Sequence, residues 1–293
     1  MLSPQLTNGA AKHDFSRVVT RLHDVSLRKT HEPFRDVPWN GPDSAIDPRD
    51  PRFRFRPDEP LGATAWYRAL PPDEQSRLGL EFICQTMRFG IALESTLSVG
   101  LLGLIRNLPA RSPMFHYALT EIIEESKHSQ MFQTFIDKSG CTPAPLSALD
   151  RWISRRIERL APVYPEQFFV WVLAGEIFVD ADNRLRLEHR ATLHPLIERM
   201  MQIHVTEEAR HMRFAEAYLR EHLPRLGALG RAQIRAVATF IMRGSSKVML
   251  EPSPAIVQRF AIPRAVLREA FGPGTPHRAH KAEIEAAVHA VLS

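Results

Sequence analysis

The sequence predicts an all-α protein built around one bundle of long helices, and three observations support this prediction. The composition is that of an ordinary globular chain, because 44% of the 293 residues are apolar and 24% are charged. In several long stretches, apolar residues recur at three- and four-residue steps, as on one face of an amphipathic helix. Val and Ile are sparse beside Ala, Leu and Arg, and no alternating strand pattern of useful length is present.

The first 73 residues are expected to form an N-terminal helix, at about residues 15–27, and a proline-rich strap packed on the core. Nine prolines fall within residues 31–73, so the strap cannot form a long helix. Aromatic residues between the prolines are too apolar for a free linker: Phe34, Trp39, Phe53, Phe55 and Trp66. Residues 74–293 are expected to form the helical bundle, and the chain is interpreted as a single globular domain.

Capping residues and prolines place the ends of the remaining helices. Residues 73–107 read as one long helix. Ser112 and Pro113 are a suitable N-cap and first residue for the next helix, and Gly140 is a suitable residue to end it. Further helices are expected at about residues 149–160, 165–181, 195–222, 228–250, 264–271 and 277–292.

Charge and cysteine content disfavour several classes of protein. The net charge is +5, but the basic residues are mostly arginines mixed with acids, which is typical of a solvated surface rather than a nucleic-acid site. Two cysteines cannot form a disulfide scaffold or a cysteine-only zinc site. We find no apolar leader segment, and no stretch reaches the ~18 apolar residues that a membrane span needs. We therefore expect a cytoplasmic protein that binds neither nucleic acid nor membranes.

Two helices carry the same pair of potential metal ligands. Glu125 and His128 are three residues apart, so they project from one face of a helix, one turn apart. On a later helix, His204, Glu208 and His211 fall within one narrow stripe that spans two turns. A single Glu-x-x-His pair usually belongs to a solvated helix surface. Two such pairs on two long helices are typical of bundles in which carboxylates bridge two iron or two manganese ions.

That architecture requires one more inward glutamate from each of two other helices. Glu94 and Glu176 each stand among apolar residues of a long helix. An isolated ionised carboxylate is too costly to bury there, so it must be neutralised, paired or bound to a cation. Oxygen and imidazole donors without thiolate suit iron or manganese better than structural zinc. The predicted metal ligands are Glu94, Glu125, His128, Glu176, His204, Glu208 and His211.

Two glutamates stand directly before the predicted ligands. Glu124 and Glu207 point about 100° away from Glu125 and Glu208. They have Lys127 and Arg210 at i+3. We interpret them as ion pairs at the surface or just outside the metal ligands.

Two further acids share a helix with the predicted ligands. Glu121 lies in the same stripe as Glu125 and is interpreted as a residue just outside the metal ligands. Asp180, one turn after Glu176, is a candidate to orient a ligating imidazole. It could equally be an ordinary acid near a helix end.

The order of these residues resembles the p-aminobenzoate N-oxygenase family of non-haem di-iron enzymes. The most specific part is residues 202–211, which read QIHVTEEARH. There, His204 is additional to the two histidines of an ordinary bundle of this class. The resemblance covers residues 75–225. It implies a ferritin-like, ribonucleotide-reductase-like bundle with two iron ions and O2 as co-substrate. The implied reaction oxidises an amine to a hydroxylamine, nitroso or nitro product, in the biosynthesis of a specialised metabolite.

This interpretation needs a small-molecule amine substrate, free or bound to a carrier protein. It also needs an external electron donor, because the sequence has no flavin or nicotinamide fingerprint. A homodimer is compatible with it. A di-iron C–H hydroxylase or desaturase is the alternative, since it uses the same metals. An iron-storage subunit is disfavoured by the chain length, and a radical-forming reductase subunit because no tyrosine lies within one turn of a proposed ligand.

Overall fold

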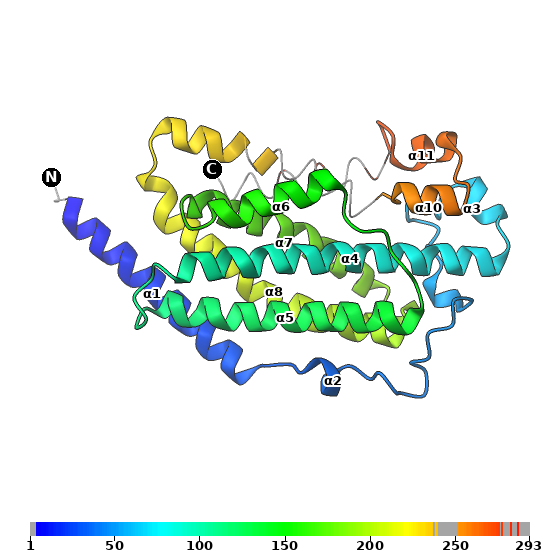
Figure 1. Cartoon of the computed structure of the whole chain (residues 1–293), viewed down its shortest axis with the longest axis horizontal. Helices are drawn as coiled ribbons and strands as arrows, with labels where there is room; N and C mark the ends of the chain where they lie inside the picture. Colours follow the sequence, from blue (N-terminus) through cyan, green and yellow to red (C-terminus); the bar gives the residue numbers. More distant parts are fainter. Residues whose placement is uncertain are drawn as a thin grey trace.

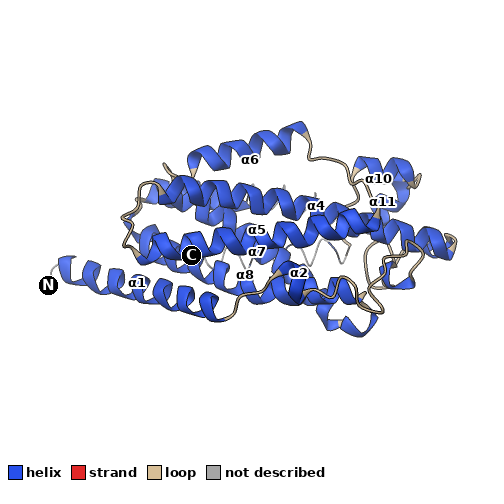
Figure 2. Ribbon diagram, turned by 60° about the horizontal axis from the view of Figure 1, so that its bottom comes forward, coloured by secondary structure: helices blue, strands red, loops and turns tan. Residues whose placement is uncertain are grey.

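A computed structural model of the chain consists of helices and connecting segments, without a strand among the residues it describes (Figure 1, Figure 2). The structure describes residues 4–236, 238, 239, 251–275, 277, 282 and 286. The all-α prediction is confirmed. Of the helix expected over 228–250, residues 228–236 are helical and most of the rest lies outside the described residues, as does most of the helix expected over 277–292.

Four long helices form the core and run side by side along the molecule (Figure 1). Helix α4 pairs with α5 and α7 with α8, and the two pairs pack on each other. A proline stands at the start of each helix, where its missing N–H is not needed. The result is a ferritin-like four-helix bundle. Its helices are α4 (Pro72–Ile105), α5 (Pro113–Ser139), α7 (Pro165–Glu188) and α8 (Pro195–His222).

The ends of α5 follow from its capping residues as predicted. The Ser112 side chain accepts a hydrogen bond from the Phe115 backbone N–H in the first turn, as an N-cap side chain does. Gly140 takes the left-handed conformation, with φ of 68°, that ends the helix. Close packing of α4 on α7 depends on Gly100, where an added Cβ would lie 2.3 Å from the Phe168 ring.

The remaining elements cover the bundle. Helix α1 packs on α5 and α8, α6 packs on α4 and α7, and η1 in the strap packs on α4. Apart from short helices the strap is irregular, as its prolines predict, and Trp39 and Phe53 are buried. These elements are α1 (Pro4–Arg28), α2 (Pro33–Asp36), η1 (Pro51–Phe53), α3 (Ala65–Ala69), α6 (Ala148–Leu160), η2 (Arg190–Thr192), η3 (Leu223–Arg225), α10 (Pro254–Arg259) and α11 (Arg264–Phe271).

Helix α7 continues seven residues beyond its predicted end at residue 181. The apolar pattern stops there, but the helix does not, because pairs of opposite charge at i, i+4 support its last turns. Arg184 pairs with Asp180 at 2.7 Å, and Arg186 pairs with Asp182 at 2.9 Å. The prediction was wrong because it followed hydrophobic periodicity alone. Helix α1 is likewise longer than predicted, and α10 was not predicted.

Helix α4 is long and apolar enough, by length and composition, to pass for a membrane span, unlike any other helix in the described part of the chain. In this fold 44% of the 18-residue apolar stretch of α4 that gives this result is buried inside the molecule. It contributes buried residues such as Leu97 and Leu101 to the largest core cluster. Helix α4 therefore reads as a core helix of the bundle.

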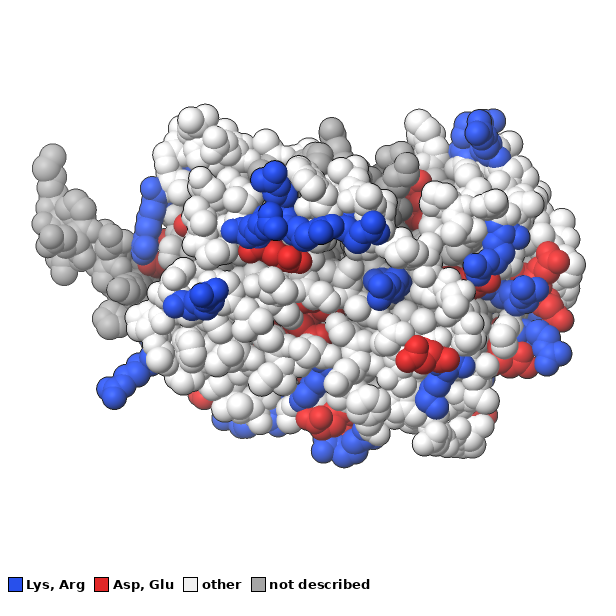
Figure 3. Space-filling model, viewed as in Figure 1, with Lys and Arg blue, Asp and Glu red and all other residues white. Residues whose placement is uncertain are grey.

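Acidic and basic side chains are mixed over most of the face shown in Figure 3, except for a row of basic side chains over α6. Four arginines of α6 are exposed, and no α6 residue is buried. The Arg156 guanidinium lies over the Trp152 ring, 5.0 Å from its centre. The row is thus the solvated side of an amphipathic helix.

Candidate metal centre

The structure places all seven predicted ligands in one cluster inside the bundle. Glu94 comes from α4 and Glu176 from α7, and the other five come from α5 and α8. Each residue is at most 1% exposed. Four carboxylates and three imidazoles therefore share a space that water hardly reaches.

Two carboxylates lie between two imidazoles at the centre of the cluster. His128 Nδ1 is 3.1 Å from Glu125 Oε2 and 3.1 Å from Glu208 Oε1. His211 Nδ1 is 2.8 Å from Glu125 Oε1 and 3.0 Å from Glu208 Oε2. Adjacent ligand atoms of an octahedral ion with bonds of about 2.1 Å lie about 3 Å apart. The spacing therefore suits metal ions, which Glu125 and Glu208 would hold together with His128 and His211.

The other three predicted ligands surround this centre. His204 Nε2 is 3.3 Å from Glu94 Oε1 and 3.6 Å from Glu208 Oε1. Glu94 Oε2 and both oxygens of Glu176 are buried without a hydrogen-bond partner in the part of the chain described. Burial raises the pKa of both carboxyls, since ionised carboxylates are costly in this environment. Bound cations would remove that cost, so the donor set fits a dimetal site.

The donor atoms fall into three overlapping groups, within each of which all atoms lie within 4.8 Å of one another. Two groups share Glu94 and two share Glu125. The donors are thus spread over more than one position, which suits two neighbouring ions. The groups are Glu94–His128–His204–Glu208, Glu121–Glu125–His211 and Glu94–Glu125–Glu176.

Burial lowers the pKa of a buried histidine, whereas neighbouring carboxylates raise it, and the balance differs among the three histidines. Burial lowers the pKa of His204 to about 4, so its ring is neutral, as metal ligation requires. For His128 and His211 burial also disfavours the charged ring, but hydrogen bonds and charge interactions with the surrounding glutamates outweigh it and raise the pKa. Protons and metal ions therefore compete for the Nδ1 atoms of these two rings.

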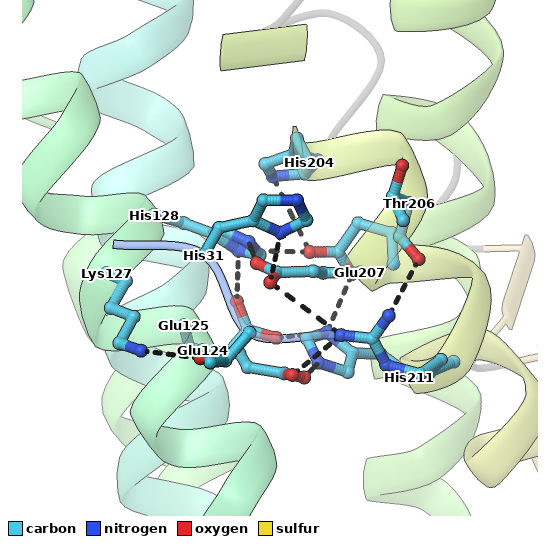
Figure 4. Close-up of polar contacts among 12 residues, drawn as sticks. His31, Glu124, Glu125, Lys127, His128, His204, Thr206, Glu207 and His211 are labelled. Atoms are coloured by element: carbon cyan, nitrogen blue, oxygen red, sulfur yellow. Dashed lines mark hydrogen bonds and ion pairs between the residues drawn. The ribbon is translucent and has the colours of Figure 1, made fainter. Parts of the chain in front are cut away.

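A second ring of charged residues holds the far nitrogen of two imidazoles (Figure 4). His128 Nε2 lies 2.9 Å from Glu207 Oε2, and His211 Nε2 lies 2.8 Å from Glu124 Oε2. Arg210 donates to Glu124 at 2.6 Å. Glu124 and Glu207 are 2% and 1% exposed, so they do not lie at the surface but just outside the metal ligands, the other position expected for them. They hold the ring orientation of a histidine on the opposite helix, as carboxylates behind metal-ligating histidines do.

The end of α1 and the start of the strap pack against the residues that contact these two imidazoles. His31 Nδ1 lies 2.9 Å from Glu207 Oε1, and Arg210 Nε donates to Ser26 Oγ at 2.8 Å. Lys127 pairs with Glu32 at 2.7 Å rather than with Glu124. Sequence reasoning missed His31 because the strap has no periodicity from which a contact could be predicted. The repeat of two adjacent glutamates before x-x-His was a usable signal for Glu124 and Glu207.

Of the two further acids, Glu121 lies among the predicted metal ligands and Asp180 does not contact an imidazole of the described chain. Asp180 pairs with Arg184, and its other oxygen is buried without a hydrogen-bond partner in the described chain, so it holds no imidazole there. Instead, Asn183 Nδ2 lies 3.4 Å from His204 Nδ1, on the part of α7 beyond its predicted end. Glu121 is fully buried among the ligands, and both its oxygens are without a hydrogen-bond partner in that part of the chain.

One tyrosine lies closer to the centre than the sequence suggested. Tyr117 is fully buried on α5, one turn before Glu121, and its hydroxyl has no hydrogen-bond partner among the described residues. Burial raises its pKa, and the charges that act on it include His211 and Glu121. Tyr117 is about two helical turns from Glu125, so its spacing from the predicted ligands did not indicate it.

A cavity opens beside His204, between α4, α5, α7 and α8. The Phe132 ring forms part of its wall and lies 5.5 Å from the His204 ring. An added Cβ at Gly90 would lie 3.0 Å from Phe132, so the glycine lets this ring pack closely on α4.

Four inward carboxylates with Glu-x-x-His on two helices define a carboxylate-rich dimetal helical bundle. Comparison with known proteins agrees, because the family model "P-aminobenzoate N-oxygenase AurF" matches residues 12–293. The chain belongs to this family. Its fold and dimetal site are those of an oxidase or oxygenase.

Relatives and solved structures extend the comparison. "Uncharacterized protein Rv0885" of Mycobacterium tuberculosis and "Uncharacterized protein Mb0909" of Mycobacterium bovis are each 34% identical over 258 residues, 88% of this chain and 76% of theirs. A mutant R2-like ligand-binding oxidase with an aerobically reconstituted Mn/Fe cofactor matches with TM-score 0.58 at 13% identity, covering 94% of both chains. The R2-like ligand-binding oxidase from Sulfolobus acidocaldarius matches with TM-score 0.56 at 12% identity, covering 94% of this chain and 89% of its own. These two likenesses confirm the ferritin-like fold.

Proposed function

We propose that this chain is a non-haem di-iron oxygenase that uses O2 to oxidise the nitrogen of an amine. The observation that carries the proposal is His204. It is a third imidazole within the buried carboxylate cluster, 3.3 Å from Glu94, and a cavity opens directly beside it. An ordinary bundle of this class needs only two histidines. Membership of the p-aminobenzoate N-oxygenase family supports the amine as substrate.

The proposed roles follow from the contacts. Glu94, Glu125, His128, Glu176, His204, Glu208 and His211 hold the metals. Two bound ferrous ions would supply electrons to O2. Glu124 and Glu207 keep His211 and His128 oriented through their Nε2 atoms. The buried surroundings exclude water, so the reaction is confined to the substrate in the cavity.

The remaining requirements lie outside the chain. The substrate is a small amine, free or tethered to a carrier protein, and the product serves the biosynthesis of a specialised metabolite. An external donor supplies electrons. The Mn/Fe cofactor of the R2-like oxidase makes a mixed metal pair the second candidate for the centre.

The test starts with metal-free protein loaded anaerobically with Fe²⁺, with Mn²⁺ and with both. We expect about two ions per chain, as in other bundles of this class. The loaded protein is then mixed with O2, a chemical reductant and a panel of aryl and alkyl amines, and the products are identified by mass spectrometry. Nitrogen-oxidised products support the proposal. Hydroxylated or desaturated carbon products instead support the C–H hydroxylase or desaturase, and binding of fewer than two ions contradicts both.

A further inference from the structure

The cavity beside His204 is mainly apolar. Its volume is about 60 Å³, which is room for a small group rather than for a whole drug-sized molecule. Its apolar walls include Ile83, Met87, Phe132, Val179, Ile197 and Met200. A ligand that fills it must therefore present an apolar body to these side chains.

One wall of the cavity is polar, and its cation is already neutralised. Arg186 is the only Lys or Arg among the described residues that line the cavity. Its Nε lies 2.9 Å from Asp182, and its Nη1 lies 3.5 Å from Glu59 of the strap. The three side chains are 14–18% exposed, so water screens these contacts weakly. A substrate carboxylate placed here would meet two carboxylates beside a single guanidinium group.

The surface outside the cavity, next to Arg186, also carries more carboxylates than guanidinium groups. A neighbouring hollow shares Asp182 and Arg186 with the cavity and opens toward the strap, where Asp58, Glu59 and Arg56 also line it. Three carboxylates thus face two guanidinium groups along this approach. Such a surface favours neutral or positively charged molecules over anions.

Building on the proposed oxidation of an amine, we propose that the substrate is an apolar amine without a carboxylate, bound in the cavity beside His204. Asp182 and Glu59 act as specificity-determining residues, because they engage the guanidinium group that an anionic substrate would need. The amine nitrogen faces the metal centre, and an apolar part of the substrate lies between α4, α7 and α8.

The test compares three amines that differ in one group: p-aminobenzoate, p-aminobenzamide and p-aminobenzylamine. Their dissociation constants are measured by calorimetry on metal-loaded protein without reductant, so that no turnover is needed. In the unmodified chain the amide and the benzylamine should bind at least about 10-fold more tightly than the carboxylate. In the double variant Asp182→Asn/Glu59→Gln, Arg186 loses both partners, so p-aminobenzoate should gain about 10- to 100-fold in affinity.

Two further variants sharpen the test. Adding Arg186→Gln to the double variant should remove the gained affinity for the carboxylate. Asp180→Asn is the matched control, because it breaks the Arg184 pair on the same helix without touching the cavity. Equal binding of carboxylate and amide by the unmodified chain, an unchanged preference in the double variant, or no binding of any probe overturns the proposal. Tight binding of the amide without nitrogen oxidation instead contradicts the proposed function alone.

A second inference concerns Glu121. Helices α5 and α8 each carry Glu-Glu-x-x-His, and the residue four positions before the ligating glutamate is Glu121 on α5 and His204 on α8. The donor groups match this correspondence. One group joins Glu121 to Glu125 and His211, and another joins His204 to Glu208 and His128. Glu121 is also fully buried, with both oxygens lacking a hydrogen-bond partner among the described residues.

The structure assigns Glu121 as an eighth metal ligand, on the ion held by Glu125 and His211. It corresponds to His204 on the other ion. The two ions then differ, since one has an extra imidazole and the other an extra carboxylate.

Equilibrium dialysis of metal-free Glu121→Ala, His204→Ala and the double variant against Mn²⁺ tests this assignment without turnover. Each single variant should keep one ion at unmodified affinity and lose at least about 10-fold at the other. The double variant should lose affinity at both ions, because the two residues act on different sites. Circular dichroism checks that each variant is folded. Unchanged affinity for both ions in Glu121→Ala, or a double variant identical to His204→Ala, overturns the assignment.

Discussion

Replacing Glu176 with Leu separates its role in metal binding from its cost to the metal-free fold. Both carboxylate oxygens of Glu176 are buried without a hydrogen-bond partner in the described chain, within an apolar stretch of α7. An unsatisfied buried polar group costs about 1–3 kcal/mol, so two give about 2–6 kcal/mol as an upper bound. Replacing buried ionic groups by apolar side chains of similar volume stabilises proteins by about 1–4 kcal/mol. We therefore expect the metal-free variant to be about 1–4 kcal/mol more stable than the metal-free unmodified chain.

Calorimetry and metal analysis measure the two effects separately. For a chain of this size the metal-free variant should melt about 2–8 °C higher than the metal-free unmodified protein. On loading with Fe²⁺ the order should reverse or narrow, because ions stabilise only the chain that binds them tightly. Glu188→Leu, at the exposed end of the same helix, is the control and should change neither property. A variant that binds two ions at full affinity, or that melts lower without metal, would refute the reasoning.

Three other substitutions have equally definite outcomes. His204→Ala should retain some iron through the six remaining predicted ligands, with one ion bound more weakly, but lose amine oxidation, as seen by metal analysis and product mass spectrometry. Glu207→Gln should weaken metal binding by about 10- to 100-fold, because it releases the His128 ring, whereas Glu198→Gln on the same helix should not. Burial lowers the pKa of His194, the N-cap of α8, so the fold should lose stability as the pH falls below about 6.5, where the unfolded chain gains a proton first. His194→Asn should show a smaller loss between pH 7 and pH 5.5 in thermal melts, and an equal loss would contradict this account.

The sequence predicted the core helices well because local chemistry sets their ends. Helix α8 spans the predicted residues 195–222, and α5 has its predicted cap at Ser112 and its stop at Gly140. Periodicity also placed the seven predicted ligands on inward faces, since burial of an apolar stripe fixes which way a helix is turned.

The sequence was least informative where tertiary contacts override local pattern. Glu124 and Glu207 do point away from the ligand stripe, as their spacing predicts. That direction meets another helix rather than water, however, because α5 and α8 are each packed on more than one side. The helical period gives the angle between side chains on one helix, but it does not tell whether a side chain faces water or another helix. The contacts of His31 and Glu59 could not be predicted for the same reason, since the strap has no period at all.

Residues 26–32 connect the surroundings of the metal centre to the N-terminal part of the chain. Ser26, His31 and Glu32 contact Arg210, Glu207 and Lys127, so the segment is docked on the residues that hold the ligands from behind. Ordering that outer ring and docking the segment are therefore linked equilibria, and whatever stabilises one must stabilise the other. Loss of the ions should release the segment before the bundle itself unfolds, as the least stable cooperative unit opens first. Limited proteolysis in the strap then becomes a gauge of metal occupancy, with cleavage slowing as ions bind.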